Sequence, residues 1–386
     1  MHNYTMIKQL SQACSRFYGI ALIGTQLLCF SGGHLIAQTK KGITIPVSDS
    51  TFYDAHFHLT NYIQEGTDIH KYLEIMGNRV GRSTLFGIPL QQMWSYQNSA
   101  TYAPTYYLQS DAPLYYYSFT DAYIAQAYNS LSAAEKQRFD PMITGFNPAD
   151  MYAKAHIKRV LLTFPGVFSG IGEFSIHKEF VSAKVAGEVA SLTNPALDSL
   201  LDFAGEVGLV VLIHNDMDMP FAKAGAEPVY LSQMKALLKR HPNTTIIWAH
   251  IGLGRIVHPV QPSASAPIGE RNPSYMQLVE DILADPELRH VHFDISWDEV
   301  AKYLSFSPQS LQNTITILNR YPDRFLFGTD VVAPASPEMY YAVYNKYDAL
   351  WKGLKPDVSE KLRKGNYERI FNAARQKVRA WEKAHL

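Results

Sequence analysis

The sequence predicts a (β/α)8 barrel. Eight short apolar runs along its 386 residues are typical of strands, and helix-like segments separate most of them. The run at 209–215 is apolar almost throughout, as expected for a strand buried on both faces of a parallel sheet. Several runs end on a histidine or an acidic residue, and in this fold the functional side chains lie where the strands end.

The elements follow one another in a regular order. Strands are expected at 51–58, 83–88, 142–146, 167–175, 209–215, 244–250, 290–296 and 325–330. Helices are expected at 68–79, 148–164, 197–207, 230–240, 308–319, 337–351 and 359–382. The segment 68–79 shows the helical pattern, because its apolar residues recur on one face.

Two segments interrupt this alternation. The first is Gln91–Asp140, between the second and third strands, and nine of the 24 tyrosines lie in its part from Trp94 to Tyr128. This insertion is either a subdomain that packs on the barrel or an aromatic lid for a ring-bearing or sugar-like substrate. Packing is favoured, because it is the commoner role of tyrosine. The second is Arg255–Pro273, rich in Pro, Ser and Ala, which we expect to be a loop.

The first 37 residues are predicted to be a secretory signal. Lys8 and Arg16 precede an apolar stretch of 14 residues, and small residues follow up to a cleavage site near Ala37. A membrane span needs about 20 apolar residues, so an uncleaved anchor is the less favoured alternative. We therefore expect a periplasmic or extracellular protein whose barrel domain comprises residues 38–386. That domain contains no cysteine, which excludes disulfides and thiolate ligands from it.

The charge of the chain excludes some kinds of partner. Its formal net charge is zero, and it contains no run rich in Lys and Arg, so nothing in the sequence supports a nucleic-acid partner. A small-molecule substrate is expected instead, and the sequence leaves open whether the chain forms a homo-oligomer.

Candidate metal ligands end several of the expected strands, and they are His56, His58, Glu173, His214, His250 and Asp330. A His-x-His pair alone is a weak indication, because His290 and His292 repeat it at the start of a strand, at the opposite end of the barrel. His56 and His58 differ, since they end their strand and point the same way. Imidazole and carboxylate together favour a divalent metal, zinc first.

Separate arguments support the acidic residues as candidate ligands and catalytic groups. A carboxylate such as Asp330 would be costly in an apolar setting without compensation, and a cation supplies it. Glu173 could instead pair with an arginine such as Arg255. We expect Asp330, His250 and Arg255 to be catalytic, with Arg255 binding a substrate carboxylate. Weaker candidates are His177 and Lys178 as substrate contacts and Asp216 and Asp294 as groups that orient histidines.

The motifs together resemble the amidohydrolase superfamily, and within it the amidohydrolase-related branch. They are D-A-H-F-H at 54–58, H-N-D at 214–216, A-H-I-G at 249–252, G-T-D at 328–330 and N-Y-E-R-I-F at 366–371, and the resemblance spans 51–371. It implies that His56 and His58 bind the deeper metal and that His214 and His250 complete the site. It also implies that Asp330 binds metal and shuttles protons.

The fourth strand departs from a familiar pattern of this superfamily. It offers Glu173 where many members carry a carbamylated lysine. A similar glutamate bridges two metals in TatD-type hydrolases, so the resemblance leaves one or two ions open.

These observations favour one function over two others. The first is a metal-dependent hydrolase that uses activated water on an ester, lactone, amide or phosphoester bond. The alternative is a metal-dependent, non-oxidative decarboxylase of an aromatic acid, and the third is a binding protein on a barrel that has lost activity. Glu173 and the predicted export favour hydrolysis, and the complete ligand set argues against the third.

Overall fold

The computed structural model describes residues 51–61, 65–88, 93–94, 108–109, 117–178, 191–219, 227–254 and 275–386. The predicted signal at 1–37, much of the tyrosine-rich insertion and the loop at 255–273 lie outside these residues. Within the described ranges, no helix combines the length and the apolar character that crossing a membrane requires.

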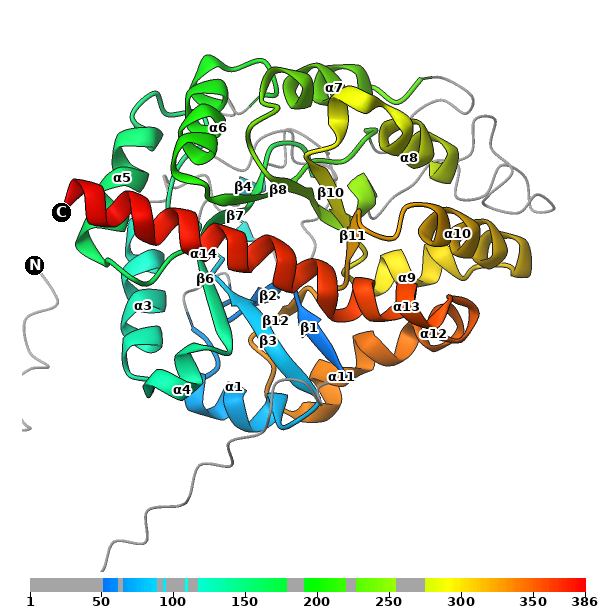
Figure 1. Ribbon diagram of the computed structural model, residues 1–386, viewed down its shortest axis with the longest axis horizontal. Helices are drawn as coiled ribbons and strands as arrows, with labels where there is room; N and C mark the ends of the chain where they lie inside the picture. The colour runs from blue at the N-terminus through cyan, green and yellow to red at the C-terminus, as the bar shows by residue number, and fades with distance from the viewer. Residues whose placement is uncertain are drawn as a thin grey trace, which may run out of the picture. The chain divides into compact units, whose positions relative to one another are not determined.

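A parallel sheet of eight strands curls into the predicted barrel (Figure 1). Its order is β1-β3-β6-β7-β8-β9-β10-β11, so that each strand pairs with the next one along the chain. The bounds are β1 Phe52–Asp54, β3 Val80–Leu85, β6 Phe139–Ile143, β7 Gly170–Ser175, β8 Val210–His214, β9 Ile246–Trp248, β10 Val291–Asp294 and β11 Phe325–Leu326.

Short extensions link the last strand to the first. β2 (Phe57–His58) pairs in parallel with β12 (Val331–Val332). The N–H of Ala55 donates to the carbonyl of Phe327 at 3.0 Å, and the N–H of Asp330 donates to that of His56 at 2.8 Å. The ring of strands therefore closes at the point where two of the predicted motifs meet. A separate pair, β4 (Met93–Trp94) and β5 (Leu108–Gln109), lies in the insertion.

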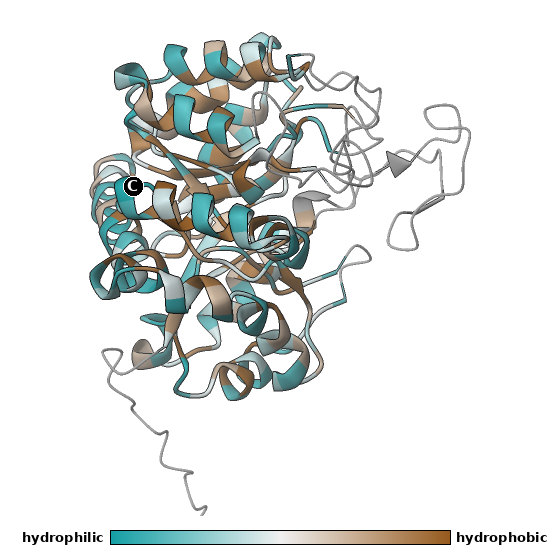
Figure 2. Ribbon diagram, turned by 90° about the vertical axis from the view of Figure 1, so that its right-hand side faces the viewer, coloured by the Kyte–Doolittle hydropathy of each residue, from teal (hydrophilic) through white to brown (hydrophobic). Residues whose placement is uncertain are grey.

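Helices surround the strands, with their polar faces outward (Figure 2). Three of them begin alike, because Asn194, Ser307 and Ser336 each cap the helix with a side-chain oxygen and a proline follows. The bounds are α1 Ile69–Met76, α3 Tyr117–Asn129, α4 Ala133–Lys136, α5 Ala153–Thr163, α6 Pro195–Val207, α7 Leu231–Arg240, α8 Tyr275–Ala284, α9 Asp298–Leu304, α10 Pro308–Arg320, α11 Pro337–Lys346, α12 Asp348–Gly353, α13 Pro356–Glu360 and α14 Asn366–His385. Short turns of other helix types lie at η2 Ala249–Gly252, η4 Pro286–Leu288 and η5 Lys361–Gly365.

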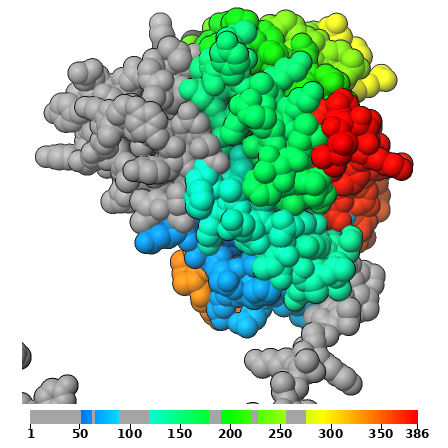
Figure 3. All heavy atoms as spheres, turned by 90° about the vertical axis from the view of Figure 1, so that its left-hand side faces the viewer, coloured from blue at the N-terminus to red at the C-terminus, as the bar shows by residue number. Residues whose placement is uncertain are grey.

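The last helix, α14, covers the amino-terminal end of the barrel (Figure 1). Its buried residues Tyr367, Ile370 and Phe371 form one apolar cluster with residues that point into the barrel, such as Leu212 and Ile247. Its far end packs against α5 and α6, as the space-filling view shows (Figure 3). The barrel is therefore open for function only at its carboxyl end.

Charged groups attach α14 to the strands. Asp140 of β6 is fully buried and accepts hydrogen bonds from Arg82 at 2.8 Å and from the Tyr367 hydroxyl at 2.7 Å. Arg375 adds a third bond from its Nε, and Arg82 also reaches Asn372 at 2.6 Å. This explains why the N-Y-E-R-I-F segment is structural in this chain.

The third strand begins earlier than the sequence pattern indicates. It is β6, Phe139–Ile143, and not 142–146. Pro141 misled the prediction, since proline is rare inside a sheet. At this position in the sheet Pro141 is needed only as a hydrogen-bond acceptor, and its carbonyl accepts the N–H of Ser169 at 2.9 Å. The insertion therefore ends at Arg138 instead of Asp140, and its last part forms α3 and α4.

The carboxyl-terminal helices also differ from the prediction. The expected helix at 337–351 is divided at Tyr347 into α11 and α12, since the backbone of Tyr347 leaves the helical conformation with a ψ of 4°. The Tyr347 hydroxyl turns inward and donates to the carbonyl of Trp297 at 2.9 Å. The expected helix at 359–382 begins within α13 and passes through the π-helical turn η5 into α14. Helices α8 and α9 were not predicted.

Candidate metal centre

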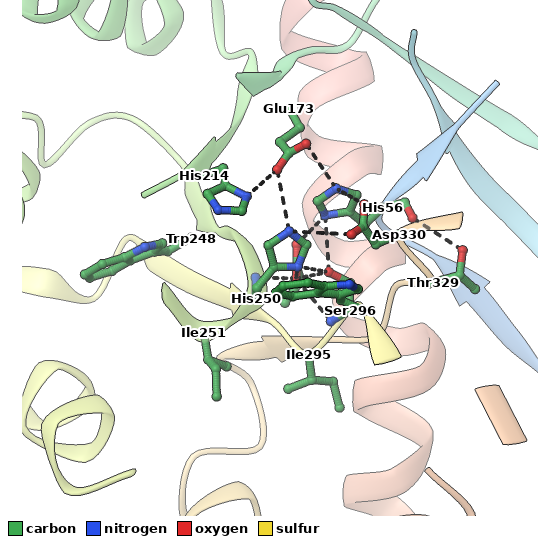
Figure 4. A network of polar contacts seen from close by, with 12 residues as sticks. His56, Glu173, His214, Trp248, His250, Ile251, Ile295, Ser296, Thr329 and Asp330 are labelled. Carbon is green, nitrogen blue, oxygen red and sulfur yellow. Dashed lines mark hydrogen bonds and ion pairs between the residues drawn. The ribbon is translucent and has the colours of Figure 1, made fainter. Parts of the chain in front are cut away.

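Six side chains from six points of the barrel rim converge, and Figure 4 labels five of them, all except His58. They come from the ends of β1, β2, β7 and β8 and from the turns after β9 and β11, and they are His56, His58, Glu173, His214, His250 and Asp330. All six predicted ligands therefore lie together, and five of them are buried while Asp330 is partly exposed.

The first group consists of His56, His58, Glu173 and Asp330. Oδ1 of Asp330 lies 3.3 Å from Nε2 of His56 and 3.2 Å from Nε2 of His58. Oε2 of Glu173 lies 3.7 and 3.5 Å from the same two nitrogen atoms. One atom from each of the four residues lies within 4.8 Å of the others, which is the spacing of ligands around a single cation.

The second group shares Glu173 with the first. Oε1 of Glu173 lies 2.6 Å from Nδ1 of His214 and 3.5 Å from Nε2 of His250. The two oxygen atoms of this carboxylate therefore face two different groups, one on each side.

The donors fit a divalent cation. Nε2 of His56 and Nε2 of His250 are buried and make no hydrogen bond within the described part of the chain. Buried polar atoms are rarely left without a partner, and here both point toward carboxylates. Nitrogen and carboxylate oxygen are the donors that zinc takes in catalytic sites.

The charges at the site depend on one another. Burial alone would lower the pKa of His56, but the charges of Asp330 and Asp294 raise it well above its usual value. Burial would raise the pKa of Asp330, but the charges of His56 and His250 hold it well below its usual range. For Glu173, burial is likewise outweighed by the charge of Lys178 and by the hydrogen bond with His214, so its pKa also lies well below normal. The two acids are therefore carboxylates.

Two of the converging residues have unusual backbone conformations. His250 has a φ of 56° and Asp330 a φ of 55°, in the left-handed region that non-glycine residues seldom adopt. Such residues cluster at functional sites. The first position of the G-T-D motif requires glycine, because a Cβ at Gly328 would lie 2.6 Å from Cβ of His56.

Asp54 joins the first and last strands beneath the site. It is fully buried and accepts the N–H and the hydroxyl of Thr329 at 2.9 and 2.6 Å and the hydroxyl of Tyr340 at 2.7 Å. Burial raises the pKa of Asp54 to about 6. The first residue of D-A-H-F-H thus holds the turn that presents Asp330.

Comparison with known families agrees with this geometry. The sequence profile of the amidohydrolase family matches residues 53–373. The chain belongs to the amidohydrolase family. It is therefore an enzyme of a metal-dependent family whose members include hydrolases and decarboxylases. No match was found among curated proteins.

Solved structures are similar to this amidohydrolase at low sequence identity. A protein from Acinetobacter baumannii, named as a probable 2-pyrone-4,6-dicarboxylic acid hydrolase and crystallised with citric acid, is 11% identical, with a TM-score of 0.50 over 83% of this chain and 99% of that one. An amidohydrolase from Burkholderia multivorans with bound zinc is 12% identical, with a TM-score of 0.49 over 84% and 99%. The 5-carboxyvanillate decarboxylase of Sphingomonas paucimobilis is 14% identical, with a TM-score of 0.42 over 83% and 98%.

The other candidates have different positions in this amidohydrolase. Arg255, which was expected to be catalytic, lies outside the described residues. Asp216 contacts Nε2 of His214 at 3.0 Å, as an orienting group would. His177 stacks on the ring of Tyr230 with 3.8 Å between centroids. Lys178 is half-buried, and its charge acts on the Glu173 carboxylate.

The second His-x-His pair is not part of the centre. His290 lies 3.0 Å from the carbonyl of Leu238, and burial lowers the pKa of His292 to about 3. Neither residue belongs to a group of potential ligands within the described ranges. The prediction that this pair lies away from the site is confirmed.

Three residues at the site were not singled out from the sequence. Ser296 contacts His250 and Asp294, and its position two residues after Asp294, just beyond the end of β10, was the available signal. The ring of Trp297 lies 5.3 Å from that of His250, and the ring of Phe86 lies 4.6 Å from that of His58. Aromatic residues are common in cores, so no pattern in one sequence marks these two.

Proposed function

We propose that this amidohydrolase is a hydrolase that cleaves an ester, lactone, amide or phosphoester bond of a small molecule with activated water. The observation that supports it most is the position of Glu173, whose two oxygen atoms face two separate groups of ligands. Such a carboxylate can bridge two divalent cations, for which zinc is the first candidate, and two-metal sites are typical of hydrolytic enzymes.

Each ligand has a defined part in this proposal. His56, His58 and Asp330 would hold one cation with Oε2 of Glu173, and His214 and His250 would hold the other with Oε1. When bound, a divalent cation acts as a Lewis acid and lowers the pKa of neighbouring water to about 7.

Asp330 is the group placed to move protons. It is ionised, and its Oδ2 lies 3.8 Å from Nε2 of His250. In the proposed reaction it accepts the proton of the attacking water and later donates it to the leaving group. Its partial exposure keeps it within reach of a substrate at the rim.

Decarboxylation of an aromatic acid is the second candidate. The rings of Trp297 and Phe86 border His250 and His58, and aromatic rings of this kind favour a planar substrate. Export of the enzyme, which rests on residues 1–37, stays a prediction.

Metal analysis and product analysis test the proposal together. Purified wild type should retain zinc, whereas His56→Ala should lose it, because one ligand is removed. His290→Ala is the matched control, since it alters a His-x-His pair away from the site. Equal metal in wild type and His56→Ala would contradict the metal centre.

Products then separate the two candidate activities. A panel of lactones, esters and aromatic carboxylic acids is incubated with the zinc-loaded enzyme. Hydrolysis products that are absent with His56→Ala are expected. Release of carbon dioxide without hydrolysis would overturn the proposal in favour of the decarboxylase.

A further inference from the structure

One carboxylate at the end of β10 contacts two predicted ligands that come from different strands. Oδ2 of Asp294 lies 3.0 Å from Nδ1 of His56. Its other oxygen accepts the hydroxyl of Ser296, and Oγ of Ser296 lies 2.8 Å from Nδ1 of His250. All four side chains are buried, so water does not replace these contacts.

The direction of these hydrogen bonds follows from counting protons. Oδ1 of Asp294 receives the backbone N–H of His250 at 2.8 Å and that of Ser296 at 3.2 Å, so this oxygen acts as an acceptor. The hydroxyl of Ser296 has a single hydrogen, and it donates that hydrogen to the same oxygen. Toward His250, the hydroxyl can then only accept.

The two rings are therefore left with the same tautomer. Nδ1 of His250 must carry a hydrogen to donate to Ser296, and Nδ1 of His56 must carry one to donate to the carboxylate of Asp294. In a neutral ring, the lone pair then lies on Nε2. These Nε2 atoms are the ones that face Glu173 and Asp330.

Asp294 also fixes the backbone of one ligand. Its bond to the N–H of His250 holds that residue at a φ of 56°. A left-handed conformation of a non-glycine residue persists only where its surroundings determine it. The same carboxylate thus sets the position of the His250 ring as well as its tautomer.

We propose that Asp294 and Ser296 form a positioning pair that fixes His56 and His250 as Nδ1–H tautomers and so keeps both Nε2 lone pairs available for a cation. Asp294 acts on His56 directly and on His250 through Ser296. The inference deepens the proposed function and rests on it, because it assigns the residues that prepare the centre to bind metal.

Ser296→Ala separates the two arms, since it removes the contact to His250 at 2.8 Å while Nδ1 of His56 keeps its contact to Asp294 at 3.0 Å. The longer contact between Ser296 and His56, at 3.3 Å, is lost as well. The tautomer is read in metal-free protein with 15N-labelled histidines, at a pH high enough to make both rings neutral, because the effect of burial on His56 is outweighed by nearby carboxylates, which raise its pKa. NMR should then show Nδ1–H tautomers for both rings in the wild type. Ser296→Ala should shift His250 to a mixture while His56 is unchanged, and Asp294→Asn should shift both. Zinc affinity, measured by competition with a chelating dye, should fall about 10–100-fold in Ser296→Ala.

Ser169→Ala is the matched control. Ser169 is also a buried serine of the barrel, but its hydroxyl has no hydrogen-bond partner in the described residues, so neither tautomer nor affinity should change. An Nε2–H tautomer of His250 in the wild type would overturn the proposal, as would an unchanged tautomer in Ser296→Ala. The tautomer is read without metal or activity, so a wild type that binds no zinc contradicts the proposed function alone.

Discussion

The two ends of the barrel bury carboxylates in opposite ways. At the amino-terminal end, Asp140 is surrounded by arginines and a tyrosine that donate to both of its oxygen atoms. At the carboxyl end, Glu173 and Asp330 face histidines, and the buried Nε2 atoms of His56 and His250 make no hydrogen bond in the described residues. The carboxylate at the first end is balanced by charged groups of the protein, whereas the donors at the second end fit a divalent cation.

This difference separates groups that stabilise the fold from groups that perform chemistry. A buried carboxylate that is paired with permanently charged arginines already has its charge balanced within the protein. Imidazole nitrogen atoms that have no hydrogen-bond partner can still bind a cation, and the left-handed backbone at Asp330 is a strained conformation of the kind that clusters at functional sites. Burial and charge alone therefore do not identify a site, whereas unpartnered histidine nitrogen atoms that converge with carboxylates indicate one.

The largest effect on the free energy of unfolding is expected from a substitution in the Asp140 network at the amino-terminal end of the barrel. Asp140→Asn removes the charge that Arg82 and Arg375 share, and loss of one partner of a buried ion pair costs about 3–5 kcal/mol. Urea denaturation should show this loss of unfolding free energy. Lys71→Ala, in an exposed ion pair with Glu74, is the control and should cost less than about 1 kcal/mol. A similar small loss in Asp140→Asn would mean that the network does not stabilise the barrel.

A smaller effect on the free energy of unfolding is expected from a substitution in the candidate metal centre at the carboxyl end of the barrel. Zinc at 100 times its dissociation constant should raise the unfolding free energy of the wild type by about 2.7 kcal/mol. Glu173→Gln should lose most of this gain and bind fewer zinc ions per chain, because the carboxylate that faces both groups is gone. Thermal unfolding with and without zinc measures the gain. An undiminished gain in Glu173→Gln would remove the bridging role.

The smallest effect is expected for Asp121, a buried carboxylate that pairs with neither an arginine nor a histidine in the described residues. Within the part of the chain that the structure describes, Asp121 accepts the backbone N–H groups of Thr144 and Gly145, and burial raises its pKa to about 7. The folded state then holds the proton more tightly than the unfolded state, so stability falls as the pH rises from 5 to 6. The slope from this group is at most about 1.4 kcal/mol per pH unit.

Asp121→Asn tests this slope. The variant cannot ionise, so its unfolding free energy should fall less than that of the wild type between pH 5 and pH 6. Other titrating groups contribute equally to both proteins and cancel in the difference. Identical pH slopes would show that Asp121 is not protonated in the folded state at these pH values.

The sequence predicted the barrel and the six ligands because both follow local rules. Strands buried on two faces are apolar, and parallel strands bring their carboxyl ends to one rim, so ligands such as His214 and His250 could be placed without coordinates. The start of β6 was missed, because a proline in a strand depends on which carbonyl needs a donor across the sheet.

The positioning groups depend on contacts between distant residues. The sequence around Ser296 does not show that its hydroxyl lies between His250 and Asp294. Likewise, the role of Asp54 depends on its contacts with Thr329 and Tyr340. These pairs are separated by up to 286 positions in the chain, and no local pattern links them.

The location of α14 makes completion of this enzyme a late event in its synthesis. The helix comprises residues 366–385, and the interior of the barrel at its amino-terminal end is covered only after that segment has left the ribosome. Until then the nascent polypeptide exposes apolar strands, as partly folded chains of this size do. A polypeptide that completes its fold late stays unfolded for longer, and an unfolded polypeptide is the form that a secretion channel or a chaperone binds.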